Sequence, residues 1–454
     1  MAYIAPFRAL RYDPARTPIS NVVTQPYDKI TPAMQESYYA ASPYNLVRIE
    51  LGKRETNDNE RKSTYTRAAS SFGDWRRQGV FMQEAQPSIY LYVQRFTPPG
   101  GATELERRGF IALGRIEDYS AGVVFRHEQT LAKPKADRLD LLRATRAHFG
   151  QIFMLYSDPS GEVEGLLARS SAPDLELRDE YGVTHQLWRI SDPGLIEMLR
   201  GKMRDKKLII ADGHHRYETA LAYRNERRAA ATSAPGAPAT SVPRERSAAA
   251  THAETTELAP YEMMMMTFIN MDSAGLVVLP THRVVHGLDS FSADAFAEGA
   301  REHFSVEQVD PAMSALRAEA ILREEGKAGT ALLAVAADRA FLLHTPKAIG
   351  SEVFSGLSLR QQSLDVVQLH KALLEGVLGL SPESIRDQQN LSYVRDTGEA
   401  LTRVRTGAAN VAFLMNPARM QQVRDIAFAS EVLPQKSTDF YPKLLSGLTI
   451  YALE

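Results

Sequence analysis

The chain has no cysteine among its 454 residues, which excludes disulfides, iron–sulfur clusters, thiolate zinc sites and cysteine nucleophiles. It also lacks an excess of one charge, since 53 lysines and arginines face 55 aspartates and glutamates, a net charge of −2. This balance makes nucleic acid an unexpected partner. No apolar run approaches the ~20 residues of a membrane helix, and the N-terminus lacks the apolar core of a signal peptide. We therefore expect a cytoplasmic protein without a membrane segment.

Several sequence signatures of known chemistry are also missing. There is no Gly-x-Ser-x-Gly turn of a serine hydrolase, no Gly-x-Gly-x-x-Gly after a strand and no His-Glu-x-x-His. Lys436-Ser437-Thr438 lacks the preceding glycines of a phosphate loop. The chemistry must therefore be sought in less familiar clusters of polar residues.

Apolar patterns along the chain predict a mixture of strands and helices. Strands are expected at 44–50, 88–96, 107–115, 151–156, 184–190, 208–211 and 410–415, and hairpins at 263–279 and 331–344. Helices are expected at 60–79, 137–148, 293–303, 364–378 and 417–427. Frequent hairpins beside helices predict an α+β protein with mixed sheets, and the length predicts two to three subdomains.

Residues 229–258 mark the clearest boundary in composition. The segment is rich in Ala, Ser, Thr and Pro and has almost no large apolar residue, so burial cannot offset its chain entropy. We expect a flexible insertion here, between an N-terminal domain at 1–228 and a C-terminal domain at 259–454. Four methionines follow at 263–266. Because successive strand residues point to opposite faces, a buried strand explains them better than a metal site.

The most informative motif lies between an apolar run and a helical pattern, and it reads Asp212-Gly213-His214-His215-Arg216. A strand-to-helix turn directs backbone N–H groups and the positive end of the helix dipole to one place, which favours an anion. Gly213 lets the backbone approach a ligand closely, Arg216 offers a fork that suits phosphate, and Asp212 is a candidate Mg²⁺ ligand. Two explanations remain open beside this one: a helix start capped by Asp212, and metal binding by the two imidazoles.

A second polar segment opens the helix expected at 137–148. His127 and Glu128 form a candidate pair for general base catalysis. Three cations that would neutralise a phosphate follow, namely Lys133, Lys135 and Arg138. A solvated charged loop would explain the same residues.

A third polar segment lies near the C-terminus. Its candidate contacts to an anion are Lys436, Ser437, Thr438 and Lys443. Prolines flank these residues, so a surface loop without a ligand is the alternative.

These motifs occur together and in order in a known family. The chain resembles the "domain of unknown function 1015" family of bacteria and archaea over nearly its whole length. The resemblance is carried by Tyr27-Asp28, Ser42-Pro43-Tyr44-Asn45, His127-Glu128-Gln129-Thr130, Lys135-Ala136-Asp137-Arg138, residues 211–218, Pro280-Thr281-His282-Arg283 and residues 434–443. One departure is Val23-Thr24-Gln25-Pro26-Tyr27, where members usually read Ala-Pro-Pro-Tyr.

The motif at 212–216 also resembles the phosphate-binding motif of free serine kinases in the ParB/sulfiredoxin superfamily. That resemblance implies a ParB/sulfiredoxin-like nucleotide-binding core, with nucleotide phosphates at residues 213–216 and Glu128 as the base. It implies a phosphotransferase that uses ATP or ADP, with Mg²⁺, on a small hydroxylated metabolite, free serine first. His127 would tune Glu128, and His214 or His215 would donate hydrogen bonds to the leaving group.

Two other functions remain open at this point. One is a nucleotide-binding regulatory protein without turnover, in the manner of ParB switches. The other is a phosphatase that acts on a small phosphorylated metabolite. The oligomeric state has no signature in the sequence.

Overall fold

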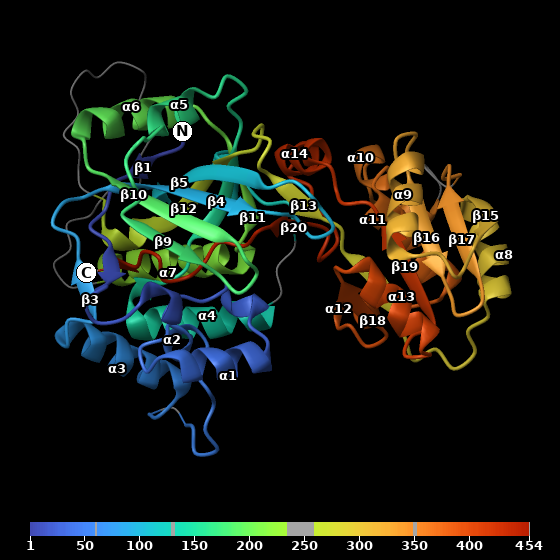
Figure 1. The fold of residues 1–454 in the computed structure, drawn as a ribbon, viewed down its shortest axis with the longest axis horizontal. Coiled ribbons are helices and arrows are strands. Elements are labelled where there is room, and N and C mark those ends of the chain that lie inside the picture. The colour runs from blue at the N-terminus through green and yellow to red at the C-terminus, as the bar shows by residue number, and fades with distance from the viewer. Residues whose placement is uncertain (60, 129–131, 234–257, 348–351, 454) are drawn as a thin grey trace. The chain divides into compact units, whose positions relative to one another are not determined.

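A computed structural model describes residues 1–59, 61–128, 132–233, 258–347 and 352–453 (Figure 1). The chain divides into two compact units. Unit 1 comprises Met1–Phe125, Thr130–Leu276 and Pro442–Glu454, and unit 2 comprises Arg126–Gln129 and Val277–Tyr441. Helices and several sheets alternate along the chain, so the expected mixed α+β class is confirmed.

Unit 1 is built on a mixed sheet. Within its described residues nine strands form this sheet, in the order β6-β11-β8-β12-β5-β4-β10-β9, with β1 paired to β5. Their bounds are β1 Ile4–Ala5, β4 Ile89–Phe96, β5 Leu105–Arg115, β6 Val124–Phe125, β8 Ile152–Tyr156, β9 Leu175–Arg178, β10 Thr184–Ile190, β11 Leu208–Asp212 and β12 Met263–Asn270. Shorter pairs join β2 (Leu10–Tyr12) to β3 (Phe81–Gln83) and β7 (Ala147–His148) to β21 (Tyr451–Ala452).

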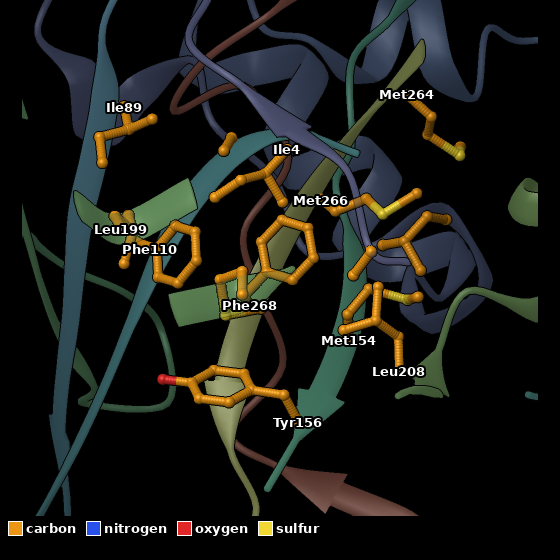
Figure 2. Packing of buried hydrophobic residues seen from close by; sticks show 14 of the residues in the cluster. Ile4, Ile89, Phe110, Met154, Tyr156, Leu199, Leu208, Met264, Met266 and Phe268 are labelled. Carbon is orange, nitrogen blue, oxygen red and sulfur yellow. The ribbon is translucent and has the colours of Figure 1, made fainter. Parts of the chain in front are cut away.

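The helices of unit 1 help to build two hydrophobic cores. They are α1 Pro32–Ala41, α2 Val47–Glu50, α3 Thr64–Arg77, α4 Ala132–Thr145, α5 Glu162–Leu167, α6 Pro193–Met203 and α7 His214–Ser233. Alternate residues of the main sheet form one core with α5, α6 and α7. In it, the rings of Phe110 and Phe268 stack with centroids 5.0 Å apart, beside Met266 (Figure 2). The methionines of β12 are all buried, as the strand interpretation expects.

One strand expectation in unit 1 is wrong. Residues 44–50 form a turn and the short helix α2 instead of a strand. The Asn45 side chain accepts a hydrogen bond from Val47 N at 2.9 Å and donates one to Asn21 O at 2.8 Å. This local capping competes with extended backbone. Leu46 and Ile49 then pack in the second core, together with side chains of α3.

Unit 2 has an antiparallel sheet of six strands among its described residues, in the order β15-β17-β16-β19-β14-β18, and a separate β13-β20 pair. The strands are β13 Val277–Leu279, β14 His282–Val285, β15 Ser305–Val309, β16 Ala331–Val335, β17 Ala340–His344, β18 Leu391–Val394, β19 Val411–Met415 and β20 Asp439–Tyr441. The helices are α8 Ala293–His303, α9 Ala315–Glu325, α10 Leu359–Gln362, α11 Asp365–Gln368, α12 Pro382–Arg386, α13 Thr397–Arg405 and α14 Met420–Phe428. A π-helix, Leu369–Val377, continues α11.

The hairpin expected at 263–279 is also wrong. β12 is a central strand that pairs with β5 on one side and β8 on the other, so it has no edge for a further strand. β13 pairs with β20 instead.

The two units divide the chain differently from the expected domains. The segments 259–276 and 442–454 belong to unit 1, because β12 completes its sheet and the last residues pair with its strands. Of the expected insertion at 229–258, residues 229–233 continue α7 and residues 234–257 lie outside the described residues. In the part of the chain that the structure describes, no helix is both long and apolar enough to cross a membrane.

Candidate functional site

The turn between β11 and α7 has a backbone shape that only glycine adopts readily. Gly213 has φ +93, in the left-handed region. A Cβ at this position would lie 3.0 Å from Ile152 Cδ1 and 3.1 Å from Arg216 Nη2. The hydrogen bond from Tyr217 N to Gly213 O, 2.9 Å long, begins the helical pattern, so the amides of the first turn form the positive end of α7.

Two cations flank the carboxylate that ends β11. Asp212 Oδ2 lies 3.1 Å from Arg216 Nη2, and Asp212 Oδ1 lies 3.4 Å from Lys443 Nζ. We call these three residues the Asp212 cluster. Burial alone would raise the pKa of Asp212, but the charges of Lys443 and Arg216 outweigh it and hold this pKa well below its usual range. One carboxylate against two cations leaves an excess of one positive charge.

Arg216 is fixed by the protein itself. Its Nη1 donates to Gln151 O at 2.7 Å and its Nη2 donates to Asp212, and the side chain is 12% exposed. The guanidinium therefore lies over Gly213 in a preorganised position. Of the two histidines of the motif, His214 is buried and His215 is half-buried.

The N-terminal segment contributes to the same charge environment. Lys29 also lowers the pKa of Asp212. The Arg138 guanidinium lies 4.2 Å from the centre of the Tyr27 ring and donates to Glu50 O at 2.6 Å. Burial, with a contribution from Asp28, raises the pKa of Tyr27 to about 12. The charges of Arg216 and Asp212 also act on the pKa of Tyr27, so the Tyr27-Asp28 motif lies in the electrostatic environment of the N-terminus of α7.

Glu50 is a candidate that sequence reasoning missed. Three polar groups converge over Gly150: Ser446 Oγ, Arg216 Nη1 and Glu50 Oε1 lie 2.8, 2.9 and 3.4 Å from where a Cβ would stand. Glu50 is buried, and burial raises the pKa of its carboxyl against the opposing effects of Ser446 and Arg216. The signal in the sequence was a glutamate inside the mostly apolar run 46–51.

Two predicted cations of α4 are paired with carboxylates of unit 1. Lys135 Nζ donates to Glu218 Oε2 at 3.0 Å, and Arg138 Nε donates to Asp137 Oδ2 at 2.9 Å. Neither residue forms an ion pair with the Asp212 cluster among the described contacts. Lys133 belongs to α4, but its side chain lies outside the described part.

The structure brings the second and third motifs together within unit 2. His127 Nε2 lies 2.8 Å from Thr438 Oγ1, and Lys436 N donates to Glu128 Oε1 at 3.0 Å. The Ser437 hydroxyl donates to Pro434 O at 2.5 Å. Lys436 has φ +57, an uncommon conformation for a lysine. These polar groups therefore hold the loop at 433–438 against residues 127–128.

A metal site has limited support from protein side chains. Among the described residues, no three His, Asp or Glu side chains lie close enough together to hold one ion. Mg²⁺ is commonly bound through one or two carboxylates together with substrate phosphates. Asp212 can supply one such carboxylate.

The fold and this site define a mixed α+β protein with a cationic cluster at a glycine-containing strand-to-helix turn. The chain belongs to the DUF1015 family, a protein family of unknown function whose model matches residues 4–367. The predicted family is thus confirmed, although the C-terminal motif lies beyond the matched range. No curated protein matches the chain.

Several solved structures share a low level of similarity with the chain. A conserved hypothetical protein from Pyrococcus furiosus is 11% identical, with a TM-score of 0.33 over 70% of this chain and 86% of that chain. Free serine kinase in complex with AMP is 12% identical, with a TM-score of 0.33 over 72% and 88%. C-terminally truncated SbnI from Staphylococcus aureus is 10% identical, with a TM-score of 0.34 over 74% and 85%. At these TM-scores the similarity assigns neither a fold nor an activity.

Proposed function

We propose that the protein is a phosphotransferase that moves a phosphoryl group from ATP or ADP to a small hydroxylated metabolite, with free serine as the first candidate. The observation that carries the proposal is the Asp212 cluster beside the Gly213 turn. Its excess positive charge, at the positive end of a helix, suits nucleotide phosphates. The motif's resemblance to free serine kinases supports the same ligand, and with it a ParB/sulfiredoxin-like core around β11 and α7.

Positioning and charge neutralisation supply most of the catalysis in phosphoryl transfer. The amides of Gly213 and His214 would hold the phosphates, and Arg216 and Lys443 would neutralise them. His214 or His215 would donate a hydrogen bond to the leaving oxygen. Because Arg216 is already held by Gln151 and Asp212, little conformational entropy remains to be lost when phosphate binds.

The chemical step needs a base for the acceptor. The acceptor hydroxyl gives its proton to the Glu128 carboxylate, its oxygen forms the new bond to phosphorus, and the bond from phosphorus to the nucleotide oxygen breaks. Glu128 belongs to unit 2, and this role follows from the resemblance of the motif. The hydrogen bond from Lys436 N orients the carboxylate, and His127 would tune its basicity.

Asp212 would hold Mg²⁺, which when bound supplies further positive charge to the phosphates. Six residues stay predicted as weaker anion contacts: Lys133, Lys135, Arg138, Lys436, Ser437 and Thr438.

The proposal is tested by incubating the protein with ATP or ADP and serine, and by detecting phosphoserine and the nucleotide product by mass spectrometry. Arg216→Ala should lower turnover by about 10³-fold while the protein stays folded. Arg228→Ala is the matched control, since Arg228 lies on the same helix and pairs with Glu262. Unchanged turnover in Arg216→Ala would remove Arg216 from the mechanism.

Two results would favour the other functions. Nucleotide affinity without any phosphorylated product would indicate a regulatory nucleotide-binding protein. Phosphate release from phosphoserine in the absence of nucleotide would indicate a phosphatase.

A further inference from the structure

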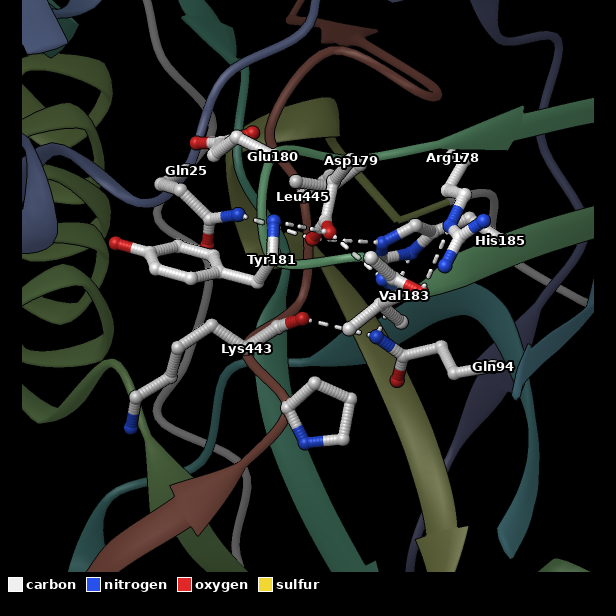
Figure 3. A network of polar contacts seen from close by, with 12 residues as sticks. Gln25, Gln94, Arg178, Asp179, Glu180, Tyr181, Val183, His185, Lys443 and Leu445 are labelled. Carbon is white, nitrogen blue, oxygen red and sulfur yellow. Dashed lines mark hydrogen bonds and ion pairs between the residues drawn. The ribbon is translucent and has the colours of Figure 1, made fainter. Parts of the chain in front are cut away.

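A buried polar chain runs through unit 1 from the β9–β10 turn towards the C-terminal segment (Figure 3). The first residue of this chain is Asp179, and both oxygens of its carboxylate accept hydrogen bonds. Oδ1 accepts from the amides of Tyr181 and Val183 at 2.9 Å each. Oδ2 accepts from His185 Nε2 and from Gln25 Nε2, at 3.1 Å each. These bonds, against the opposing effect of burial, lower the pKa of Asp179, so the group is ionised.

His185 continues the chain in one tautomer. Its ring is fully buried, and burial lowers its pKa despite the neighbouring Asp179, so the imidazole is neutral. Because Nε2 donates to the carboxylate, Nδ1 must accept. It accepts from the Tyr92 hydroxyl, 2.6 Å away. The Tyr92 oxygen in turn accepts a hydrogen bond from Leu445 N.

A neighbouring side chain holds the same segment at a second point. Gln94 pairs directly with His185 in the antiparallel β4–β10 register, and Tyr92 lies two residues away on the same face. Gln94 Nε2 donates to Lys443 O at 2.9 Å. Its Oε1 accepts from Arg107 Nε at 3.0 Å. The backbone of Lys443 and Leu445 is thus bonded to buried side chains of β4.

Burying so many polar groups is costly unless each is paired, and apolar side chains would cover the segment at lower cost. The hydrogen bonds are directional, whereas apolar packing is not. What they fix is the backbone that carries Lys443, whose ammonium reaches Asp212.

We propose that Asp179, His185, Tyr92 and Gln94 form a positioning network that holds the backbone at 443–445 so that the Lys443 ammonium stays beside Asp212. The network contacts no reacting atom and acts through Lys443. The inference rests on the proposed function in one respect, namely that Lys443 contacts the nucleotide phosphates.

The first experiment is a double-mutant cycle read by the Kd for ADP. Lys443→Met should raise this Kd about tenfold, and His185→Leu should raise it severalfold. In the Lys443→Met background, His185→Leu should change the Kd by less than about twofold, because the network has nothing left to position. An equal effect in both backgrounds would show a general structural role and overturn the inference, as would an unchanged Kd in His185→Leu.

The second experiment reads the network without nucleotide. Tyr92→Phe keeps the ring and removes the hydroxyl, so hydrogen exchange at the Leu445 amide should accelerate at least tenfold relative to global opening. Gln186→Leu is the control, since Gln186 neighbours His185 on β10 and bonds to Glu176 Oε2 instead. If ADP does not bind the wild type, or if its binding does not depend on Lys443, the proposed role of Lys443 fails. The exchange rate of the Leu445 amide then decides alone whether the network exists. Unchanged Leu445 protection in Tyr92→Phe would then overturn it.

Discussion

Two regions of this protein carry residue types that suit phosphate, and they use them in different ways. In unit 1, Arg216 and Lys443 flank a single carboxylate at the positive end of a helix, and charge of one sign is left over. In unit 2, Ser437 donates to Pro434 O, and Lys436 N donates to Glu128.

The difference lies in what each hydrogen bond does. The contacts of unit 1 orient charged groups, whereas many of those in unit 2 close a loop on the segment 127–128. A motif of lysine, serine and threonine is therefore a weaker indication of an anion site than a glycine turn with converging cations. The hydrogen bonds thus favour unit 1 over unit 2 as the place where phosphate binds. In unit 2, Glu128 is the predicted base, with His127 beside it.

The largest effect is expected from Glu128→Gln. The amide oxygen can still accept from Lys436 N, so the loop should keep its shape, but the proton acceptor is lost. Turnover should fall by about 10²- to 10⁴-fold while the Kd for ADP stays unchanged. Single-turnover kinetics and calorimetry measure the two quantities. A normal rate would reduce Glu128 to an anchor of the loop, like its neighbours in unit 2.

A smaller effect is expected from Gly213→Ala. The added Cβ meets Ile152 and Arg216 and strains the backbone, so the Kd for ADP should rise about tenfold. Gly122→Ala is the matched control, because Gly122 has φ +65 and nothing lies within 4 Å of its added Cβ. Equal ADP affinities in the two variants would mean that the Gly213 turn is only a structural turn.

The next prediction concerns strain at Lys436. Asparagine tolerates the left-handed region better than lysine, so Lys436→Asn should stabilise the protein by roughly 0.5 kcal/mol. Lys436→Met removes the same charge and keeps the strain, so its unfolding free energy should match the wild type. Urea unfolding compares the three proteins. If both variants weaken ADP binding more than threefold, the predicted anion contact at Lys436 is supported, and the two units no longer differ in how they use their cations.

Local patterns in the sequence predicted most of the helices and strands. The strand at 208–211, the turn at Gly213 and the helix after it could be predicted, because a continuous apolar run, a glycine and helical spacing follow one another there. The strand predicted at 44–50 failed because Asn45 caps a turn, and Val47 and Ile49 are buried in the short helix α2 that follows it. The hairpin at 263–279 failed because the partners of β12 lie far away in the sequence.

Part of the candidate site could also be predicted from local patterns in the sequence. Asp212 and Arg216 are four residues apart, so their ion pair is a local feature of the helix start. Lys443 was selected by its motif, but its partner Asp212 is 231 residues away and no spacing rule predicts that contact. Glu50 depends on Gly150 and Ser446, which come from two other segments. Contacts of this kind follow from the tertiary fold alone.

The smallest effect is expected from Glu50→Gln, and it appears in the pH dependence of stability. Burial raises the pKa of Glu50 in the folded state, so the unfolded state releases the proton at lower pH. The carboxyl's stabilising contribution is therefore complete below its unfolded pKa, about 4.3, and declines as the pH rises through the folded value. Glu50→Gln should remove this decline, so the variant gains stability relative to the wild type between acid and neutral pH.

Urea unfolding across that pH range measures the difference, with Glu197→Gln, an exposed glutamate on α6, as the control. Parallel pH curves for wild type and Glu50→Gln would mean that Glu50 is fully ionised beside Arg216. The guanidinium would then be neutralised by two carboxylates, Glu50 and Asp212, and the excess positive charge that distinguishes unit 1 would disappear. If the wild type instead still loses stability relative to Glu50→Gln as the pH passes through neutral, Glu50 keeps its proton there and the charge of Arg216 stays available to a bound phosphate.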